Sequence, residues 1–155
     1  MTPKKICFIS SCGGHFKELQ QLFPVAEGHH YYIVTEKNIT TTEETKQHKC
    51  YFLLQQERYN IAFFFPFFFN LFKSLWLVLK ERPMVVVSTG AGAVLPTCVF
   101  AKIFGAKVIY VETIAKISST SVTGRLIYKF ADRFYVQWQE MLTIYPNALY
   151  AGQIY

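Results

Sequence analysis

The feature that most constrains the fold is an alternation of short apolar runs with helix-length stretches along the whole chain. The strand-like runs are rich in Val, Ile, Tyr and Phe and lie at residues 4–10, 30–35, 50–54, 84–88, 107–112 and 133–137. Helix-length stretches separate most of them, at residues 16–26, 67–81, 93–104, 123–131 and 139–145. Such an alternation is typical of a parallel sheet covered on both faces. The sequence therefore predicts an α/β fold, a doubly wound, Rossmann-like parallel sheet.

Length and composition indicate one domain with an ample core. The chain has 155 residues, of which 52% are apolar and 17% charged. We therefore expect residues 1–155 to form a single Rossmann-like domain. The polar, threonine-rich segment 36–49 is predicted to be a surface loop or a poorly formed helix.

Charge and cysteine usage narrow the class of partner. Sixteen Lys and Arg against ten Asp and Glu give a net charge of +6, which suits a phospholipid surface, a polyphosphate or a nucleic acid. The basic residues are scattered rather than aligned, which disfavours nucleic acid. Cys7, Cys12, Cys50 and Cys98 show no paired spacing, so we expect reduced thiols in a cytosolic protein and no metal site. The first apolar run is too short for a signal peptide.

A glycine-rich loop follows the first predicted strand, with the sequence Ser11-Cys12-Gly13-Gly14-His15. Gly13 and Gly14 allow the backbone to approach a ligand closely, and the helix start that follows offers unpaired amides to an anion. His15 adds a titratable imidazole. These features together predict a binding site at this loop. The simpler alternatives are a tight turn without a ligand and a solvated histidine ring.

Two further loops fall at predicted strand ends. One is Ser88-Thr89-Gly90-Ala91-Gly92, and the other spans residues 112–121 and begins with Glu112. Ligands of doubly wound sheets bind at the carboxyl ends of the strands, near the point where the strand order reverses. The second loop is neither a Walker loop nor a G-x-G-x-x-G fingerprint, because the required Lys and third Gly are missing. Glu112 could alternatively mark only the place where the sheet meets water.

The segment 61–81 has the most unusual composition and contains seven of the fifteen Phe residues. Pro66 suits the first turn of a helix that continues to about Glu81. The polar side chains gather within an arc of about 120° that only Leu77 interrupts, which leaves a wide apolar arc. They are Asn70, Lys73, Ser74, Lys80 and Glu81.

A membrane crossing by this helix would place the flanking strands on opposite sides of a bilayer. We therefore expect an interfacial helix, with Arg58, Lys73, Lys80 and Arg82 near anionic headgroups. The side chains predicted to face the membrane are Phe67, Phe68, Phe72 and Trp76. A buried crossover helix is the alternative.

The same motifs carry a family resemblance that covers nearly the whole chain. The matching residues are 11–15, Glu18-Leu19, Pro83, 85–92, Pro96, 101–102, 105–112, 123–125, 131–132 and 136–138. They resemble the acceptor-side subunit of split glycosyltransferases. That family includes the membrane-associated subunit of the N-acetylglucosaminyltransferase of asparagine-linked glycan assembly, and bacterial relatives in capsule and exopolysaccharide synthesis. The sequence looks closer to the bacterial branch, because no N-terminal transmembrane anchor is present.

The layout is also similar to the N-terminal half of the GT-B enzyme that glycosylates lipid I in peptidoglycan synthesis. The first loop departs from that enzyme by having Ser-Ser-Cys where it carries further glycine, and Val111 replaces its His before the Glu. The resemblance implies that the donor half comes from another polypeptide, because the chain ends at Gly152 to Tyr155 where the linker would begin.

The resemblance implies a reaction as well as a fold. A hexosyl group would pass, with inversion, from a nucleotide sugar, expected to be a UDP-sugar, to a sugar on undecaprenyl diphosphate. A donor-binding partner would hold the nucleotide in a heterodimer, and this chain alone would bind no cofactor and be inactive. We expect a peripheral protein on the cytoplasmic face of the plasma membrane.

The resemblance also implies roles for individual residues. His15 would be the base for the acceptor hydroxyl or would hold the acceptor diphosphate as a cation, and Glu112 would bind a sugar hydroxyl or orient His15. The candidates for acceptor or phosphate contacts are Gly13, Gly14, Ser88, Thr89, Gly90 and Gly92. The alternatives are a non-catalytic enhancer that recruits and stabilises the catalytic partner, a stand-alone nucleotide-binding domain and, last, a nucleic-acid-binding protein.

Overall fold

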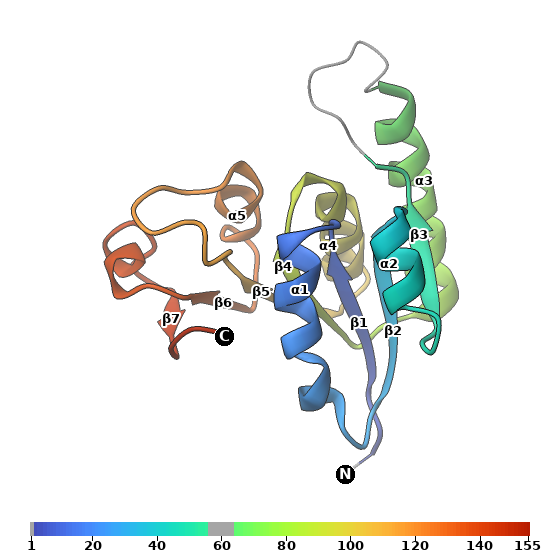
Figure 1. Cartoon of the computed structure of the whole chain (residues 1–155), viewed down its shortest axis with the longest axis horizontal. Coiled ribbons are helices and arrows are strands. Elements are labelled where there is room, and N and C mark those ends of the chain that lie inside the picture. Colours follow the sequence, from blue (N-terminus) through green and yellow to red (C-terminus); the bar gives the residue numbers. More distant parts are fainter. Residues whose placement is uncertain (1, 56–63) are drawn as a thin grey trace.

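A single seven-stranded sheet organises the computed structural model, which describes residues 2–55 and 64–155. The strand order is β3-β2-β1-β4-β5-β6-β7, and every neighbouring pair is parallel (Figure 1). The strands are β1 (Lys5–Ser10), β2 (His30–Glu36), β3 (Cys50–Leu53), β4 (Val85–Gly90), β5 (Lys107–Val111), β6 (Arg133–Val136) and β7 (Leu149–Tyr150). The predicted doubly wound parallel sheet is confirmed. The strand order reverses between β1 and β4.

Helices connect the strands and cover the two faces of the sheet. The α-helices are α1 (Gly14–Gln21), α2 (Ile39–Glu44), α3 (Phe64–Glu81), α4 (Leu95–Ile103) and α5 (Val122–Ile127). The 3-10 helices are η1 (Phe23–Ala26), η3 (Gly92–Val94) and η4 (Gln139–Thr143). The predicted start of the Phe-rich segment at residue 61, and Arg58 beside it, lie outside the described residues.

Alternate side chains of the strands build two cores. Phe8 points toward α1 and packs with Phe16 and Leu19 of that helix. Cys7 lies in the other core, which contains Leu77 of α3 together with residues of α4 and α5. Period-two alternation of this kind places α1 on one face and α3, α4 and α5 on the other.

The predicted boundaries differ from the structure in several places, for local reasons. The segment 36–49, predicted to be a surface loop or a poorly formed helix, contains the six-residue helix α2, because Asn38 and Thr41 form a reciprocal capping box. The helix expected at 16–26 divides into α1 and η1, which has Pro24 in its first turn. The helix expected at 139–145 is the 3-10 helix η4, and the two-residue strand β7 is too short to carry an apolar pattern.

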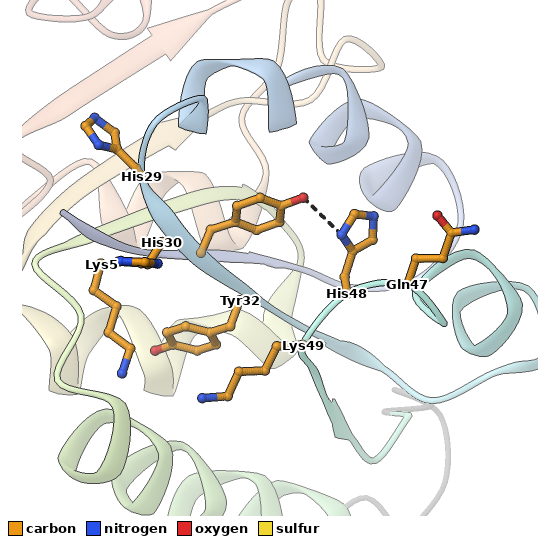
Figure 2. Close-up of a pocket in the computed structure, with 8 residues that line it drawn as sticks. Lys5, His29, His30, Tyr32, Gln47, His48 and Lys49 are labelled. Atoms are coloured by element: carbon orange, nitrogen blue, oxygen red, sulfur yellow. Dashed lines mark hydrogen bonds between the residues drawn. The ribbon is translucent and has the colours of Figure 1, made fainter. Parts of the chain in front are cut away.

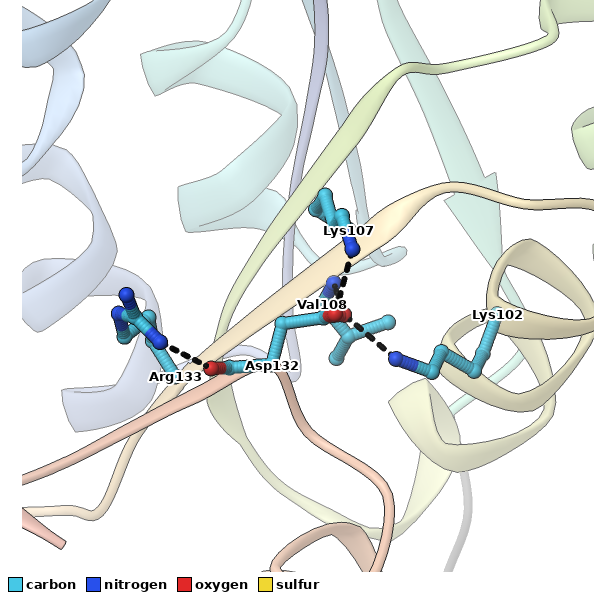
Figure 3. Close-up of polar contacts among 5 residues, drawn as sticks. All are labelled: Lys102, Lys107, Val108, Asp132 and Arg133. Carbon is cyan, nitrogen blue, oxygen red and sulfur yellow. Dashed lines mark hydrogen bonds and ion pairs between the residues drawn. The ribbon is translucent and has the colours of Figure 1, made fainter.

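An ion cluster fixes the amino ends of β5 and β6 to the end of α4 (Figure 3). Asp132 accepts hydrogen bonds from Lys102 Nζ at 2.7 Å, Lys107 Nζ at 3.0 Å and the Val108 amide at 2.9 Å. Burial opposes the charged form, but these donors outweigh it and lower the pKa of Asp132. The cluster lies at the opposite ends of the strands from the glycine loops, so its role is structural.

Candidate functional site

The two glycine loops meet at the carboxyl ends of β1 and β4, where the strand order reverses. The Ser11 amide donates to Gly90 O at 2.7 Å, and the Ala91 amide donates to Ser11 Oγ at 3.3 Å. Loops separated by about eighty residues in sequence therefore form one corner. Its position is the one at which doubly wound sheets bind ligands.

His15 is held in this corner by hydrogen bonds to Thr89. Its Nδ1 lies 2.8 Å from Thr89 O, and Thr89 Oγ1 donates to His15 O at 2.6 Å. A carbonyl oxygen only accepts, so Nδ1 carries the hydrogen in this bond. The neutral ring therefore has its lone pair on Nε2, where it can accept a proton.

The glycines of the corner serve two different purposes. A Cβ on Gly90, which has φ +101°, would lie 3.2 Å from the His15 ring and 3.1 Å from the Tyr110 hydroxyl. Gly90 therefore makes room for the ring. Gly13, with φ +74°, is the N-cap of α1, and no side chain caps this helix start. The exposed Gly13–Gly14 turn thus presents backbone amides and the positive end of the α1 dipole to an anion.

Ser88 and Thr89 lie in a strand, which corrects the predicted loop. Strand β4 runs to Gly90, and both side chains are buried. Ser88 Oγ accepts the Gly90 amide at 3.2 Å, while Thr89 holds His15. The two residues support the corner from within the sheet. The half-buried residues Ala91 and Gly92 follow Gly90, and η3 begins at Gly92.

Cys12 ties the first loop to the end of β2. Its amide and its Sγ donate to Glu36 Oε2 at 3.3 and 3.6 Å. Burial, reinforced by the Glu36 carboxylate, raises the pKa of the Cys12 thiol. The thiol is therefore protonated at neutral pH and unsuited to act as a nucleophile.

Glu112 is fully engaged by internal partners. It is only 1% exposed. Its carboxylate accepts from Ser121 Oγ at 2.9 Å, from the Thr113 amide at 3.2 Å and from the Tyr145 hydroxyl at 3.1 Å. Gly124 in α5 approaches so closely that a Cβ there would lie 2.0 Å from Glu112 Oε2. The carboxylate thus organises the start of α5.

Glu18 is a buried carboxylate of the site that the sequence reasoning did not assign. It is 2% exposed, and its Oε1 accepts from Thr113 Oγ1 at 2.9 Å and from the Ile114 amide at 3.0 Å. Burial raises its pKa, although these hydrogen bonds oppose the rise. Glu18 follows His15 by three residues on the same helix face, and this spacing was the available signal.

The structure brings together only part of the predicted site. His15, Gly13, Gly14, Thr89 and Gly90 form one corner through the contacts above. Within residues 2–55 and 64–155, no hydrogen bond or ion pair joins His15 to Glu112. No three His, Cys, Asp or Glu side chains gather as metal ligands in that part of the chain.

Helix α3 carries the residues predicted to face a membrane, and its side that faces the protein is partly polar. Asn70 and Ser74 are both 0% exposed. The Asn70 side chain pairs with the backbone N–H and C=O of Leu54, each at 2.8 Å, and Ser74 accepts from Thr97 at 2.8 Å. Leu77, Val78 and Glu81 complete the buried side.

The outer side of α3 carries large apolar side chains. Of the four predicted membrane-facing residues, Phe68, Phe72 and Trp76 are exposed and Phe67 is half-buried. Phe65, Phe69 and Leu79 are also exposed. Lys73 and Lys80 lie over rings of this face, with Lys80 Nζ 4.4 Å from the centre of Trp76. We call the exposed residues Phe65, Phe68, Phe69, Phe72, Trp76 and Leu79 the aromatic face. No helix in the described ranges is both long and apolar enough for a membrane crossing.

A polar pocket of about 480 Å³ lies at the amino ends of β1 and β2, opposite the glycine corner (Figure 2). Its two lysines have internal partners. Lys5 and Lys49 pair with the buried Glu81 at 2.7 and 2.9 Å, and Tyr51 donates to the same carboxylate. Burial disfavours the charged carboxylate, but these three partners together lower its pKa to about 2. The His48 ring lies 3.0 Å from the hydroxyl of Tyr31. These contacts to Glu81 hold the carboxyl-terminal end of α3 in place, so the lysines of the pocket have a structural role.

Sequence comparison identifies relatives over nearly the whole chain. The model of a family described as "Oligosaccharide biosynthesis protein Alg14 like" matches residues 6–154. The UDP-N-acetylglucosamine transferase subunit ALG14 of Rattus norvegicus is 26% identical, over 99% of this chain and 86% of the rat protein. The corresponding subunit of Schizosaccharomyces pombe is 39% identical, over 45% of this chain and 36% of the yeast protein.

Solved structures share the fold at low sequence identity. MurG of Acinetobacter baumannii has a TM-score of 0.73 and 16% identity, over 97% of this chain and 44% of that chain. UDP-N-acetylglucosamine 2-epimerase of Rickettsia bellii has a TM-score of 0.72 and 12% identity, over 98% of this chain and 45% of that chain. The chain spans less than half of each of these proteins. The structural similarity over nearly all of this chain confirms the predicted fold, that of one half of a GT-B protein.

Proposed function

Because the chain belongs to the Alg14-like family of oligosaccharide biosynthesis proteins, we propose that it is the acceptor-side subunit of a two-chain glycosyltransferase. A donor-binding partner holds a nucleotide sugar, a UDP-sugar in this proposal, and this chain supplies acceptor binding and membrane contact. The acceptor is a sugar on a polyprenyl diphosphate. The relatives reported above come from a rat and a fission yeast, so undecaprenyl as carrier and a capsule or exopolysaccharide as product rest on the sequence resemblance alone.

The geometry of His15 carries this proposal. A half-buried imidazole is fixed through Nδ1 to Thr89 O at 2.8 Å, beside a Gly-Gly helix start at the reversal point of the sheet. A base needs a free lone pair in a fixed direction, and a diphosphate needs backbone amides or cations. Residues 13–15 supply both the lone pair of His15 and the amides of the helix start.

The proposed chemistry is a single inverting displacement. The acceptor hydroxyl oxygen forms a bond to the anomeric carbon of the donor sugar while the bond from that carbon to the nucleoside diphosphate breaks. His15 Nε2 takes the proton of the attacking hydroxyl. The departing diphosphate leaves with the electron pair and remains with the partner chain.

Other residues of the corner have supporting roles in this proposal. The amides at Gly13, Gly14 and Gly92 bind the diphosphate of the acceptor. Thr89 and Gly90 hold and accommodate the His15 ring. Glu112, whose acceptor atoms are engaged by Ser121, Thr113 and Tyr145, shapes the loop after β5 rather than moving a proton.

The membrane contact is assigned to the aromatic face of α3. Contiguous exposed rings beside cations are typical of proteins that insert into the interfacial layer of a bilayer. The protein would thus be peripheral, on the cytoplasmic face of the plasma membrane. The lipid-linked acceptor would then reach the cleft from that surface.

The partner contact has a candidate groove on the α1 face of the sheet. A largely apolar groove of about 400 Å³ lies between α1 and the segment 151–154, over β4, β5 and β6. Val25 at its edge is exposed. We propose that the donor-binding subunit docks there, which would place the nucleotide sugar near the carboxyl ends of the strands.

A transfer assay on the reconstituted pair tests the catalytic role. The chain is co-purified with candidate donor-binding subunits and assayed with a panel of nucleotide sugars on a polyprenyl-diphosphate-linked acceptor. His15→Ala should lower transfer by at least about 100-fold, because a general base is lost, while the melting temperature and the assembly with the partner persist. His30→Ala, on an exposed histidine at the amino edge, is the matched control. Near-normal transfer by His15→Ala would favour the non-catalytic enhancer, and failure of every pairing would overturn the enzymatic proposal.

Vesicle sedimentation tests the membrane contact separately. The double variant Phe72→Ser, Trp76→Ser should lose binding to phospholipid vesicles, because both exposed rings leave the aromatic face. The matched control is Ile39→Ser, Val122→Ser, which removes two exposed apolar side chains from other surfaces. Equal binding by the two double variants would favour a crossover helix without a lipid contact.

A further inference from the structure

The carboxyl-terminal ends of α3 and α4 border a groove that shares only Leu79 with the aromatic face. It has a volume of about 680 Å³ and continues the surface of α3 beyond Leu79. Its apolar wall includes Met84 and Phe104, and Arg82 and Lys107 line it as well. The groove is therefore amphipathic, with an apolar wall and basic groups.

The apolar side chains of this wall are exposed although they are large. Leu79, Met84 and Phe104 are 48%, 54% and 56% exposed. Ile103 beside them is also exposed. Exposed apolar surface of this kind, bordered by cations, marks a contact with a membrane or another molecule.

Arg82 adopts a backbone conformation that its side chain disfavours. Helix α3 ends at Glu81, and Arg82 follows with φ +47° while its amide donates to Val78 O at 2.9 Å. Glycine or asparagine usually fills this left-handed position, because other residues bring Cβ close to the backbone. An arginine here indicates that the side chain contributes something other than the helix end.

Arg82 is also the uncompensated charge of the groove. Lys107 is paired with Asp132 at 3.0 Å (Figure 3), and the nearby Lys80 lies over the Trp76 ring. In the described parts of the chain, the guanidinium of Arg82 has no ion pair and no hydrogen bond. It is therefore available to a negatively charged group that enters the groove.

We propose that this groove binds one anionic phospholipid, with the lipid phosphate on Arg82 and an acyl chain against Leu79, Met84 and Phe104. A guanidinium binds a phosphate through two parallel hydrogen bonds, which suits a headgroup fixed at the edge of an apolar wall. This inference rests on the proposed membrane contact of α3. It adds a defined site for one lipid to the general attraction to anionic headgroups that the sequence leads us to expect. The aromatic face would supply insertion, and the groove would supply the preference for anionic lipid.

The test compares vesicles of phosphatidylcholine alone with vesicles that also contain phosphatidylglycerol. The wild-type chain should bind the anionic vesicles more strongly. Arg82→Gly should lower binding to them by about fivefold, the effect of one cation at a membrane surface, and leave binding to phosphatidylcholine unchanged. Because Gly relieves the left-handed strain, the same variant should melt about 2 °C higher.

Two further variants separate a specific site from general attraction. Arg82→Lys keeps the charge but loses the paired hydrogen bonds, so it should retain only part of the preference. Arg133→Gln removes an exposed charge on β6 and should change nothing. An equal loss in Arg82→Gly and Arg133→Gln would overturn the proposal in favour of net-charge attraction. A wild-type chain that binds neither vesicle would overturn the membrane contact itself, whereas loss of the Arg82 effect alone overturns only the groove.

Discussion

Helices α1 and α3 pack on opposite faces of the same sheet and bury different kinds of residue. Helix α1 turns Phe16 and Leu19 into the core and leaves Lys17 in solvent. Helix α3 places Asn70 and Ser74 against the protein, while Phe72 is 68% exposed. The first arrangement is the ordinary one for a surface helix. The second leaves apolar rings in water unless another phase or molecule covers them.

The difference shows two ways of fixing a helix. Apolar burial holds α1 through many non-directional contacts. In α3, a few directional bonds to Leu54, Thr97 and Lys5 set the rotation of the helix, because turning it would leave buried polar groups unpaired. The rotation in turn decides which rings face outward. A helix anchored by polar groups can therefore present an apolar surface.

The largest expected effect tests the apolar anchoring of α1. Phe16→Ala should lower the free energy of unfolding by about 4 kcal/mol, because a fully buried ring leaves a cavity next to Phe8 and Leu19. Urea denaturation measures the change. A loss below about 1 kcal/mol would show that α1 is not held by apolar burial.

The next effect is a pH dependence that belongs to α3. Glu81 has a pKa near 2 in the folded chain against an ordinary value of 4.5, so its contribution is complete above pH 4.5 and is lost as the pH falls toward 2. The shift corresponds to roughly 3 kcal/mol. Glu81→Gln should remove this part of the acid sensitivity, whereas Glu43→Gln, on an exposed carboxylate, should keep it. Denaturation at a series of pH values gives the slope of stability against pH for each variant. Identical slopes would show that the ion pairs of Glu81 do not stabilise the fold.

A smaller effect tests the amide that anchors the middle of α3. Asn70→Ala should lower the free energy of unfolding by about 2 kcal/mol, because the N–H and C=O of Leu54 lose their partner in a buried place. Asn147→Ala, on an exposed side chain, is the control. Thermal denaturation compares the two variants. If their melting temperatures are equal, the rotation of α3 is set by its apolar residues instead.

The smallest expected effect completes the comparison. Phe72→Ala should change the free energy of unfolding by less than about 0.5 kcal/mol in the absence of lipid, because the ring is largely in solvent. Urea denaturation of Phe72→Ala and Phe16→Ala compares the cost in stability of the same truncation on α3 and on α1. A large loss in Phe72→Ala would mean that the aromatic face is covered within the protein.

Local patterns were sufficient to predict much of the fold. Six of the seven strands, the parallel order with a reversal point and the two glycine loops follow from apolar periodicity and from the turn residues. His15 could be singled out because it adjoins both glycines and a helix start. The two-residue strand β7 could not be predicted, since pairing with β6 defines it rather than any run of its own.

The side-chain contacts within the candidate site join residues that are far apart in the sequence. Glu18 contacts Ile114, ninety-six residues away, and the buried Thr89 bonds to His15, seventy-four residues away. Glu112 was predicted as a site residue, yet Ser121 and Tyr145 surround it. Side-chain partners of this kind follow from how the elements pack, and no local pattern encodes them.

The sequence by itself determined the layers of this protein, the place of the glycine corner and the apolar character of α3, because periodicity and turn chemistry are properties of neighbouring residues. Only the tertiary structure decided which side of α3 faces outward and which nitrogen of His15 is free. Those choices depend on single bonds between remote elements, Asn70 to Leu54 and His15 to Thr89. A buried polar group must find a partner wherever the fold places one.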